Sequence, residues 1–504
     1  MRLIYLFWFT FLGIHSFSQV NFTELEGDHS FRVNSNGSLG VNLNNLRSAS
    51  FYQEDTSKPL LRQAGLWIVA KDLDDKYHTA THYQSIPGDY DFWSGPMDTL
   101  TGETSTNPKW NNVWIVTREQ IKTHQQDFDK SSYQLPKAIS DWPAQGSDGF
   151  ANYLAPFIDF NKNGIYDPEN GDYPDIKGRK SAYCIFNDIQ GEHQASKGQE
   201  IGIEIALMIS EYSGSQKYLE YYIINRRSTS YSDIYTGFFL DGQCGNRSDN
   251  YAGTFEKYPH SIFIYNGDDY DENHFAESTP FVMATFLNKD LSSSIACNDG
   301  NGKNGIPTNN SDFINFAESK WKDSSDLTFG GDGTAEGTSA DYIFSQLSPN
   351  ENSFWTEELA LNSPGGRTII GFTQTSNFES KDFLKMDICL DAGIIQNDEN
   401  VGEKLLKIAS ENFVSFRQSS STHSPLKSTA ISFYPNPSNG RFKLECPDQI
   451  KCVQVSDSKG ITVYSEKNIN KNEIWCNILL SSGIYYMHFT TDEGTFTEKI
   501  CVRL

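Results

Sequence analysis

The stretch KYLEYYIINRR, residues 217–227, combines aromatic and β-branched side chains and ends at a polar boundary. This composition is typical of a β-strand that is buried on at least one face. Three further segments have the same character and are bounded by Gly, Asn, Asp or Pro, namely GLWIVA (65–70), SIFIYNG (261–267) and FVMATFL (281–287). The pattern predicts a large, mainly β body of the β-sandwich kind with few short helices.

Two helices are expected among these strands. Thr117-Arg118-Glu119-Gln120 has the capping-box pattern, in which Thr117 accepts from first-turn amides and Gln120 reaches back. The helix that this box opens should extend to about Asp127. A second helix is predicted over about Val401–Asn412, with Asn400 as its cap.

Composition and charge exclude some classes of protein. The 504 residues include 65 Asp and Glu but only 41 Lys and Arg, a formal net charge of −24. A field of this sign repels polyanions, so nucleic acids and anionic membranes are not expected partners. A hydrophobic fraction of 37% indicates a globular chain, which is also long enough for a large core.

The N-terminus has the pattern of an export signal. Arg2 precedes an apolar run, Leu3–Ile14, and Ser16 and Ser18 are the small residues that a signal peptidase requires. We therefore expect residues 1–18 to be a cleaved signal peptide. An uncleaved anchor is the alternative, but the run is short for a bilayer. No other long apolar stretch occurs, so no transmembrane segment is expected in the mature chain.

Eight cysteines fit an exported protein, since an oxidising compartment permits disulfides. Without a C-x-x-C pair, neither a zinc ribbon nor a thioredoxin-type motif is expected. We expect one or two structural bridges together with buried thiols, and the pairing stays open. The cysteines are Cys184, Cys244, Cys297, Cys389, Cys446, Cys452, Cys476 and Cys501.

The sequence changes character near its end. Residues 417–430 are rich in Ser and Thr, a composition typical of a linker between domains. Residues 431–504 contain short predicted strands at regular spacing, which favours a small Ig-like antiparallel β-sandwich. The secreted body would then comprise residues 19–416.

The tail resembles the type A C-terminal sorting domain of the type IX secretion system. The resemblance rests on Tyr434, Pro435, Asn436, Pro437, Gly440, Asp457, Gly460, Gly483, Ile484, Tyr485, Lys499 and Ile500. It implies Sec export to the periplasm of a Gram-negative bacterium, passage across the outer membrane by the type IX machinery, and release or exchange of the tail for a surface lipopolysaccharide anchor. Two features depart from the expected pattern, the four tail cysteines and an end, VRL, without a terminal lysine.

The stretch DFNKNGIYDPENGDYPD, Asp159–Asp175, has the spacing of a calcium loop, with an oxygen-bearing residue at every second position and Gly164 at the bend. It is not an EF-hand, because its twelfth position is Asn170 instead of a bidentate Glu. The paucity of carboxylates predicts weak affinity, about 10⁻⁴–10⁻³ M, and a structural role. The alternative is a metal-free hairpin, which Asn163-Gly164 alone would favour. The candidate ligands are Asp159, Asn161, Asn163, Ile165 (through its carbonyl), Asp167 and Asp172.

The body, over about Gly27–Leu390, also resembles a group of secreted proteins that carry the same tail and have no established activity. The resemblance comes from a series of short segments in the expected order. They are Gly65–Ile68, Asp91–Pro96, Trp110–Trp114, Asp141–Ala144, Gly171–Pro174, Phe186–Asp188, Tyr221–Arg226, Tyr265–Asp268, Trp321–Asp323, Gly330–Gly333 and Trp355–Glu357. Asn163 stands where Asp is usual in that group, and Gly365-Gly366-Arg367 where an acidic residue and paired arginines are usual.

The sequence contains no catalytic motif that we can identify: G-x-S-x-G, H-E-x-x-H, P-loop and dinucleotide fingerprints do not occur. His78 and His82 lie in a segment with strand character, where four residues span about 13 Å, too far to share a metal. A glycoside hydrolase, however, needs only two carboxylates about 5–10 Å apart, which a sequence cannot exclude. Sugar binding also stays open, because Trp93, Trp110 or Trp355 could stack on a pyranose ring, although such residues are more often core.

The leading hypothesis is a non-catalytic, calcium-stabilised binding, adhesive or structural protein that is secreted or held at the outer cell surface, with a glycan or a protein as ligand. The rival hypothesis is a secreted hydrolase, a glycoside hydrolase or a protease, that uses paired carboxylates.

Overall fold

The computed structural model describes residues 20–502 except 106, 148, 213, 258, 269, 272–273, 347–353, 397–399, 421–431, 435–440, 458–461, 479, 481–482 and 491–494. The expected signal peptide, residues 1–18, lies outside this part of the chain. Two compact units, Met1–Ser419 and Ser420–Leu504, each have their own hydrophobic core. We refer to them as the body and the tail.

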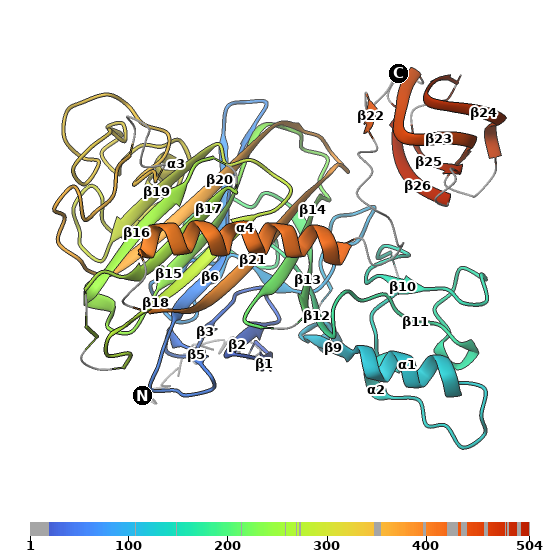
Figure 1. Ribbon diagram of the computed structural model, residues 1–504, viewed down its shortest axis with the longest axis horizontal. Coiled ribbons are helices and arrows are strands. Elements are labelled where there is room, and N and C mark those ends of the chain that lie inside the picture. The colour runs from blue at the N-terminus through green and yellow to red at the C-terminus, as the bar shows by residue number, and fades with distance from the viewer. Residues whose placement is uncertain are drawn as a thin grey trace, which may run out of the picture. The chain divides into compact units, whose positions relative to one another are not determined.

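Two large antiparallel sheets form the centre of the body (Figure 1). Buried side chains of both sheets meet in one continuous core, so the predicted β-sandwich is confirmed. In sheet order, the larger sheet contains β16 (Asn250–Phe255), β17 (Ser261–Asn266), β18 (Ser278–Phe286), β21 (Phe383–Gln396), β14 (Lys217–Asn225), β13 (Ile203–Glu211), β12 (Lys180–Asn187) and β8 (Trp93–Ser94), and β9 (Trp114–Thr117) also pairs with β12. The smaller sheet contains β19 (Ser293–Asn298), β20 (Arg367–Phe378), β15 (Tyr231–Gly242), β6 (Leu61–Asp72) and β7 (Tyr77–Thr81).

The stretch 217–227 supplies β14, a central strand of the larger sheet. Its side chains alternate between the core of the sandwich and the outer face of the sheet, which is only partly covered. Leu219, Tyr221 and Ile223 belong to the core between the sheets, whereas Tyr218 packs in a separate cluster on the outer face.

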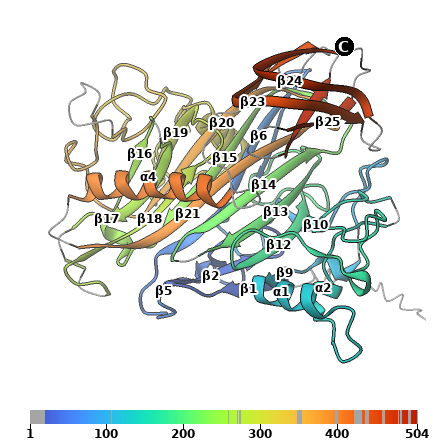
Figure 2. The same cartoon turned by 45° about the vertical axis from the view of Figure 1, so that its right-hand side comes forward.

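Two layers cover the outer face of the larger sheet (Figures 1 and 2). Near β12 and β13, residues 110–176 pack a second core against the sheet. At the other side, helix α4 (Val401–Ser420) packs on β16, β17, β18 and β21. The first layer contains η1 (Pro108–Trp110), α1 (Arg118–Asp127), α2 (Lys137–Ser140), β10 (Phe157–Ile158), η2 (Pro168–Asn170) and β11 (Tyr173–Pro174).

The first predicted helix is confirmed and the second is longer than predicted. The capping box of α1 is complete, since Thr117 accepts from the Gln120 amide and the Gln120 side chain accepts from Thr117. Helix α4 continues beyond Asn412 to Ser420, so residues 417–420 of the predicted linker are helical. The apolar spacing continues through Phe413 and Phe416, which pack over Tyr218. The rest of that linker, 421–430, lies outside the described residues.

The remaining elements of the body are one α-helix, one 3-10 helix and five short strands. Helix α3 (Asn310–Ala317) was not predicted; the Asn309 side chain caps it, and Phe313 packs 4.5 Å from the Trp67 ring on β6. None of the described helices is long and apolar enough to cross a membrane. The other elements are β1 (Phe22–Leu25), β2 (His29–Asn34), β3 (Val41–Asn42), β4 (Arg47–Ser48), β5 (Ser50–Tyr52) and η3 (Arg247–Asp249).

The tail is an antiparallel β unit around its own core, which includes Phe442, Val453 and Met487. Strand β23 pairs with β22, β24 and β25, and it changes register against β24 between Glu445 and Ile450. The strands are β22 (Ser432–Tyr434), β23 (Arg441–Asp457), β24 (Thr462–Asn477), β25 (Gly483–Thr490) and β26 (Thr495–Val502).

The expectation of one or two bridges stays a prediction, because the structure does not describe the side chains of Cys446 and Cys501. All six whose side chains the structure describes are free thiols, and five of them are buried. Cys184, Cys244 and Cys297 belong to the core of the sandwich, and Cys389 packs in the outer cluster with Tyr218. The six thiols are Cys184, Cys244, Cys297, Cys389, Cys452 and Cys476.

Candidate functional site

The loop after β10 has the local geometry that its sequence predicts. The Asp159 carboxylate accepts hydrogen bonds from the backbone amides of Asn163 (3.1 Å) and Gly164 (2.7 Å), which closes the bend. Gly164 has φ +80°, a left-handed conformation that a β-carbon would strain. The Asn163 Oδ1 atom accepts from the Ile165 amide at 2.7 Å. Side-chain oxygens therefore hold the loop backbone in a tight turn.

Asp167 is the centre of a ring of side-chain amides. Its carboxylate accepts from the side-chain amides of Asn161 (3.0 Å), Asn163 (2.9 Å) and Asn170 (2.8 Å). These donors, Asn170 first, lower the pKa of Asp167 and favour its ionised form. Two predicted ligands, Asn161 and Asn163, thus converge on a third, Asp167, and Asn170, which was not predicted as a ligand, joins them.

Asp172 has a supporting position in the loop. Its side chain is fully buried and accepts from the backbone amides of Phe160 (2.8 Å) and Asp167 (2.9 Å). Burial raises its pKa above the ordinary value. Asp172 therefore joins the two sides of the loop across the β10–β11 pair.

The donor set of the loop fits a hard cation such as calcium. Two carboxylates, Asp159 and Asp167, are connected through Asn163, which bonds to both. If their carboxamides turned, Asn161 and Asn163 could each present an oxygen beside Asp167, at the cost of the hydrogen bonds that these oxygens accept from the Asn163 and Ile165 amides. Among the described residues, no cluster of three or more Asp, Glu, His or Cys has a metal-binding arrangement. Amides and carbonyls would thus supply most of the ligands, which agrees with weak affinity.

Buried carboxylates elsewhere in the body have structural partners. Each one accepts a hydrogen bond from a backbone amide or a neutral side chain, or bonds to a Lys or Arg. Glu357, for example, binds Arg367 at 2.8 Å and accepts from the Ala252 amide. The group comprises Asp91, Asp172, Asp188, Glu204, Glu211, Glu220, Asp241, Asp271, Asp312, Glu357, Asp387 and Asp391.

One pair of these carboxylates lies on neighbouring strands. Glu220 on β14 and Asp387 on β21 are register partners on the outer face of the larger sheet. Lys385 bridges them, with its Nζ atom 3.2 Å from Glu220 and 3.0 Å from Asp387, and Lys177 lies 2.6 Å from Glu220. Burial raises the pKa of Asp387, Lys385 opposes this, and Glu220 raises it further. No sequence pattern indicates this pair, because its members are far apart in the chain.

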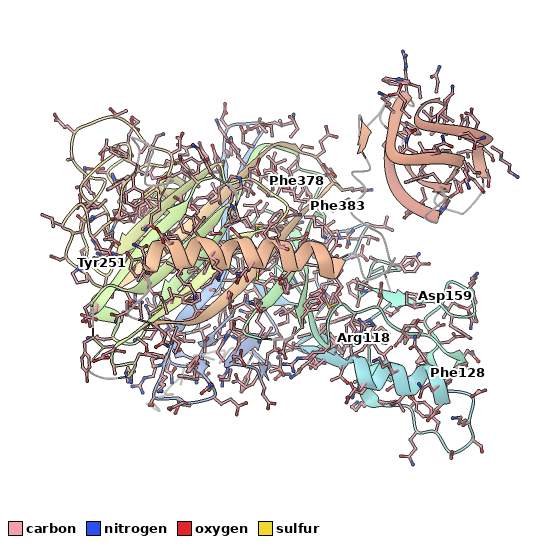
Figure 3. All side chains as sticks on the ribbon, viewed as in Figure 1. Arg118, Phe128, Asp159, Tyr251, Phe378 and Phe383 are labelled. Carbon is pink, nitrogen blue, oxygen red and sulfur yellow. The ribbon has the colours of Figure 1, made fainter. Side chains whose placement is uncertain are left out.

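An aromatic groove of about 440 Å³ opens beside this pair. Asp159 lines the groove, so the candidate calcium loop forms part of its wall (Figure 3 shows Asp159 in the covering layer). Tyr222 lies two residues beyond Glu220 on the same strand and belongs to the lining. The other lining residues are Tyr153, Leu154, Ala155, Pro156, Phe157, Tyr183, Ala206, Met208 and Ile224.

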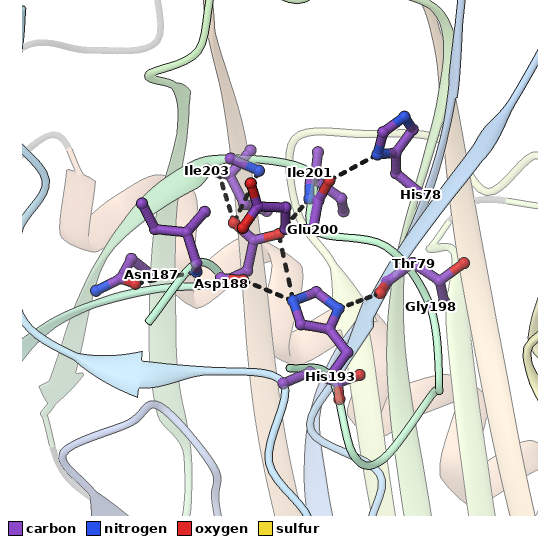
Figure 4. A network of polar contacts seen from close by, with 12 residues as sticks. His78, Thr79, Asn187, Asp188, His193, Gly198, Glu200, Ile201 and Ile203 are labelled. Atoms are coloured by element: carbon purple, nitrogen blue, oxygen red, sulfur yellow. Dashed lines mark hydrogen bonds and ion pairs between the residues drawn. The ribbon is translucent and has the colours of Figure 1, made fainter. Parts of the chain in front are cut away.

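A second, polar cleft of about 970 Å³ is lined in part by a buried histidine, His193, whose polar contacts are drawn in Figure 4. The two ring nitrogens of His193 are each 2.6 Å from a carbonyl oxygen, Nδ1 from Thr79 and Nε2 from Asp188. A carbonyl only accepts, so this placement favours a ring that carries protons on both nitrogens, the imidazolium form. Burial lowers the pKa of His193, but Asp91, Asp188 and the two carbonyls outweigh it and raise the pKa above 6.5.

The histidine pair and the tryptophans have the structural roles that we considered more common. His82 is buried, and its ring accepts from the Leu66 amide and contacts the Asn36 carbonyl oxygen at 2.9 Å. His78 lies on β7 and bonds to the Glu200 carbonyl. Trp110 and Trp355 are core residues, whereas Trp93 is half-buried. Neither the histidines nor these two core tryptophans form a ligand platform.

The structure describes part of the sorting motif. Tyr434 lies on β22 and pairs with Lys443 of β23. On the last hairpin, Tyr485 pairs with Ile500 and Tyr486 with Lys499, and Gly483 begins β25. Pro435, Asn436, Pro437 and Gly440 lie outside the described residues.

Comparison with known proteins assigns the tail. Residues 432–503 match the family described as the secretion system C-terminal sorting domain, so the chain carries a type IX sorting tail. No curated protein matches the chain. One similar solved structure is PorZ, titled an essential bacterial surface component of the type-IX secretion system of Porphyromonas gingivalis, with 9% identity and a TM-score of 0.14. The match covers 72% of this chain and 46% of that protein.

Proposed function

We propose that this chain, which its sorting tail marks for type IX export to the cell surface or the medium, is a non-catalytic binding or structural protein stabilised by calcium. The observation that carries the proposal is the state of the buried carboxylates described above. They bond to cations, backbone amides or neutral side chains, which is the arrangement of groups that hold a fold together.

Calcium would bind in the loop after β10. Asp159 and Asp167 would supply the two carboxylates, Asn161 and Asn163 would turn their amide oxygens inward, and Ile165 would offer its carbonyl. Asp172 would orient the loop from behind, because its oxygens already accept from the Phe160 and Asp167 amides. The ion would neutralise two neighbouring carboxylates and fix a loop that has no large core of its own.

The test is the thermal unfolding of the full chain with millimolar calcium and again with a chelator. A ligand that binds only the folded state at 100 times its Kd adds about 2.7 kcal/mol to the free energy of unfolding, which raises the melting temperature visibly. We expect this calcium-dependent rise to disappear in Asp159→Ala and in Asp167→Ala. An exposed acidic residue nearby, Asp129, provides the control, because Asp129→Ala should retain the full rise.

A gain of function completes the test, since Asp159→Ala also removes a cap from the loop backbone. Asn163→Asp adds a carboxylate to the ligand set, so the calcium-dependent rise should become larger at the same calcium concentration. No rise in the wild type, together with no gain in Asn163→Asp, would identify the loop as an ordinary hairpin and remove calcium from the proposal.

The route and final position of the protein are further parts of the proposal. The signal-like N-terminus supports passage through the periplasm, and the sorting tail supports handling by the type IX machinery. Attachment to surface lipopolysaccharide would follow removal of the tail.

A second candidate function is a secreted hydrolase, which the Glu220–Asp387 pair favours. Two carboxylates opposite each other beside an aromatic groove have the composition that a glycosidase needs. The lysine between them speaks against it, because Lys385 bonds to both carboxylates. Release of reducing sugar that stops in Asp387→Asn would replace the non-catalytic proposal by this one.

A further inference from the structure

The larger sheet has an uncovered strip on its outer face, between the two covering layers. Phe413 and Phe416 of α4 pack over Tyr218, and the 110–176 layer packs over Ala206 and Met208. Between these contacts, β14 and β21 present Tyr222 and Phe383, which are 37% and 40% exposed. A strip of large apolar side chains that a protein leaves uncovered is a common mark of a binding site.

The exposed rings of this strip lie in two stacked pairs. Tyr222 and Phe383 stack with ring centroids 6.5 Å apart and an angle of 30° between their planes. Across the groove, Tyr153 and Phe157 stack at 5.8 Å and 20°, and Tyr153 is 65% exposed. Flat ring faces of this kind accept the apolar C–H faces of sugars as well as other flat groups.

Two cations and two anions lie beside the strip and pair with one another. Asp159, in the groove lining, adds a third carboxylate, which the calcium ion of the proposed function would neutralise. Lys177 and Lys385 bond to Glu220 and Asp387, at distances of 2.6–3.2 Å. The Lys177 and Lys385 side chains are 40% and 31% exposed, so their ammonium groups retain hydrogen-bonding capacity toward solvent. Lys385 also lies 5.4 Å from the Tyr222 ring centroid, beside the stacked pair.

Because the charged side chains beside the strip are paired with one another, they favour a neutral ligand over an anionic or a basic one. A phosphate or an acidic peptide would need cations that are not already neutralised, and a basic ligand would need unpaired carboxylates. A neutral ligand with flat apolar faces and many hydroxyls matches both the rings and the paired charges. A cavity of about 440 Å³ limits the bound part to a few sugar rings.

We propose that the strip formed by Tyr153, Phe157, Tyr222 and Phe383 is the binding site for a neutral oligosaccharide. The aromatic rings stack on pyranose faces, and the ammonium groups of Lys177 and Lys385, held in place by the buried Glu220 and Asp387, hydrogen-bond to the hydroxyls. This inference rests on the proposed function of the body as a binding protein and names its ligand class. Calcium supports the site indirectly, because Phe157 lies two residues before Asp159 and both line the groove.

The experiment is titration calorimetry of the full chain with cellohexaose, xylohexaose and mannohexaose, in calcium. We expect at least one hexaose to bind, and Tyr222→Ala and Tyr153→Ala each to raise its Kd about tenfold or more, the effect of losing one stacking platform. The matched control is Tyr270→Ala, because Tyr270 is 51% exposed at a different site. Each variant is also melted, and an unchanged melting temperature shows that a loss of binding is local.

Several outcomes would overturn the inference. They are the absence of binding by every hexaose, or an equal Kd in the groove variants and in Tyr270→Ala. A concentration-dependent increase in mass that Tyr222→Ala abolishes would instead assign the strip to a second copy of the chain.

Two further results from the same samples would change the proposed function and leave the oligosaccharide site in place. Binding without any calcium-dependent rise in melting temperature would leave the groove assigned and remove calcium. Consumption of the hexaose that stops in Asp387→Asn, with binding still lost in Tyr222→Ala, would keep the site and make the protein a hydrolase.

Discussion

His193 shows how a single side chain holds a long segment of the body. Its imidazolium joins the Thr79 carbonyl on β7 to the Asp188 carbonyl after β12. The carboxylate of Asp188 in turn accepts from the amides of Ile201, Gly202 and Ile203. The segment between Asp188 and Ile203, which walls the polar cleft, is therefore fixed at both ends by one charged network (Figure 4).

The raised pKa of His193 predicts a loss of stability at alkaline pH. Protons bind His193 more tightly in the folded state than in the unfolded state, whose pKa is about 6.5. Its contribution is complete below pH 6.5 and is lost as the pH rises through the folded pKa, at up to about 1.4 kcal/mol per pH unit. Chemical denaturation of the full chain across this range should show the fall, and His193→Gln should remove it. Asp91 and Asp188, the charged groups that face the ring, stay in place in this variant.

His82 provides a control with the opposite sign. Burial lowers the pKa of His82 to about 3, so the unfolded chain binds the proton more tightly. His82 therefore costs stability as the pH falls below 6.5, and His82→Gln should reduce the acid slope while the alkaline slope remains. An alkaline slope that is the same in His193→Gln and in the wild type would contradict the imidazolium assignment.

The roles of side chains that act within one turn could be predicted from the sequence. Contacts between residues far apart in the chain could not. The bend at Gly164 follows from local spacing, and the structure has it. Asp172, predicted as a ligand, lies behind the loop because its oxygens meet the Phe160 and Asp167 amides. The contact between Lys385 and Glu220 joins residues 165 positions apart, so no window of sequence contains it.

Helix α4 is the element whose extent the sequence least indicated. Ser, Thr and Arg beyond Asn412 suggested a linker, but Phe413 and Phe416 lie on the face that packs toward Tyr218 and Cys389. Tertiary contact with the sheet thus extends a helix that local propensity would end. The capping box of α1 was predictable because its hydrogen bonds lie within four residues.

Packing of α4 should contribute measurably to the stability of the body. Phe413 is 6% exposed in the outer cluster, so Phe413→Ala leaves a cavity and should lower the free energy of unfolding by about 3 kcal/mol. Leu406 on the same helix is 39% exposed, and Leu406→Ala should change it by about 0.5 kcal/mol or less. Denaturant unfolding of both full-length variants measures the difference. Equal costs would mean that α4 does not pack on the sheet in solution.

At the scale of the whole molecule, the sorting signal and the candidate binding features lie in separate units. The tail has its own core and matches a sorting family, whereas the body carries the clefts and the calcium-like loop. Strand composition predicted the body sandwich because its strands are strongly apolar. The order of strands in the larger sheet could not be predicted, since it brings β14 beside β21 across the whole second half of the body.

Deletion of residues 420–504 should therefore change where the protein goes and leave the body fold intact. We expect the truncated chain to accumulate inside the outer membrane instead of at the surface or in the medium. Cell fractionation and protease treatment of intact cells measure this. Fusion of residues 420–504 to an unrelated exported reporter should send that reporter outward. Surface exposure of the truncated chain would contradict the assignment of the tail as the address.

The reactivity of the free cysteines in the body depends on whether the body has already folded. Burial raises the pKa of Cys244 and Cys297 to about 12, so almost no reactive thiolate exists at neutral pH once the core has closed. A newly exported, still unfolded chain would expose the same thiols to an oxidising compartment and to one another. Folding of the sandwich thus shields its own cysteines from oxidation and cross-linking. The fraction of chains that escape wrong cross-links then depends on how fast the body folds, and no disulfide among the six described thiols is needed to hold it.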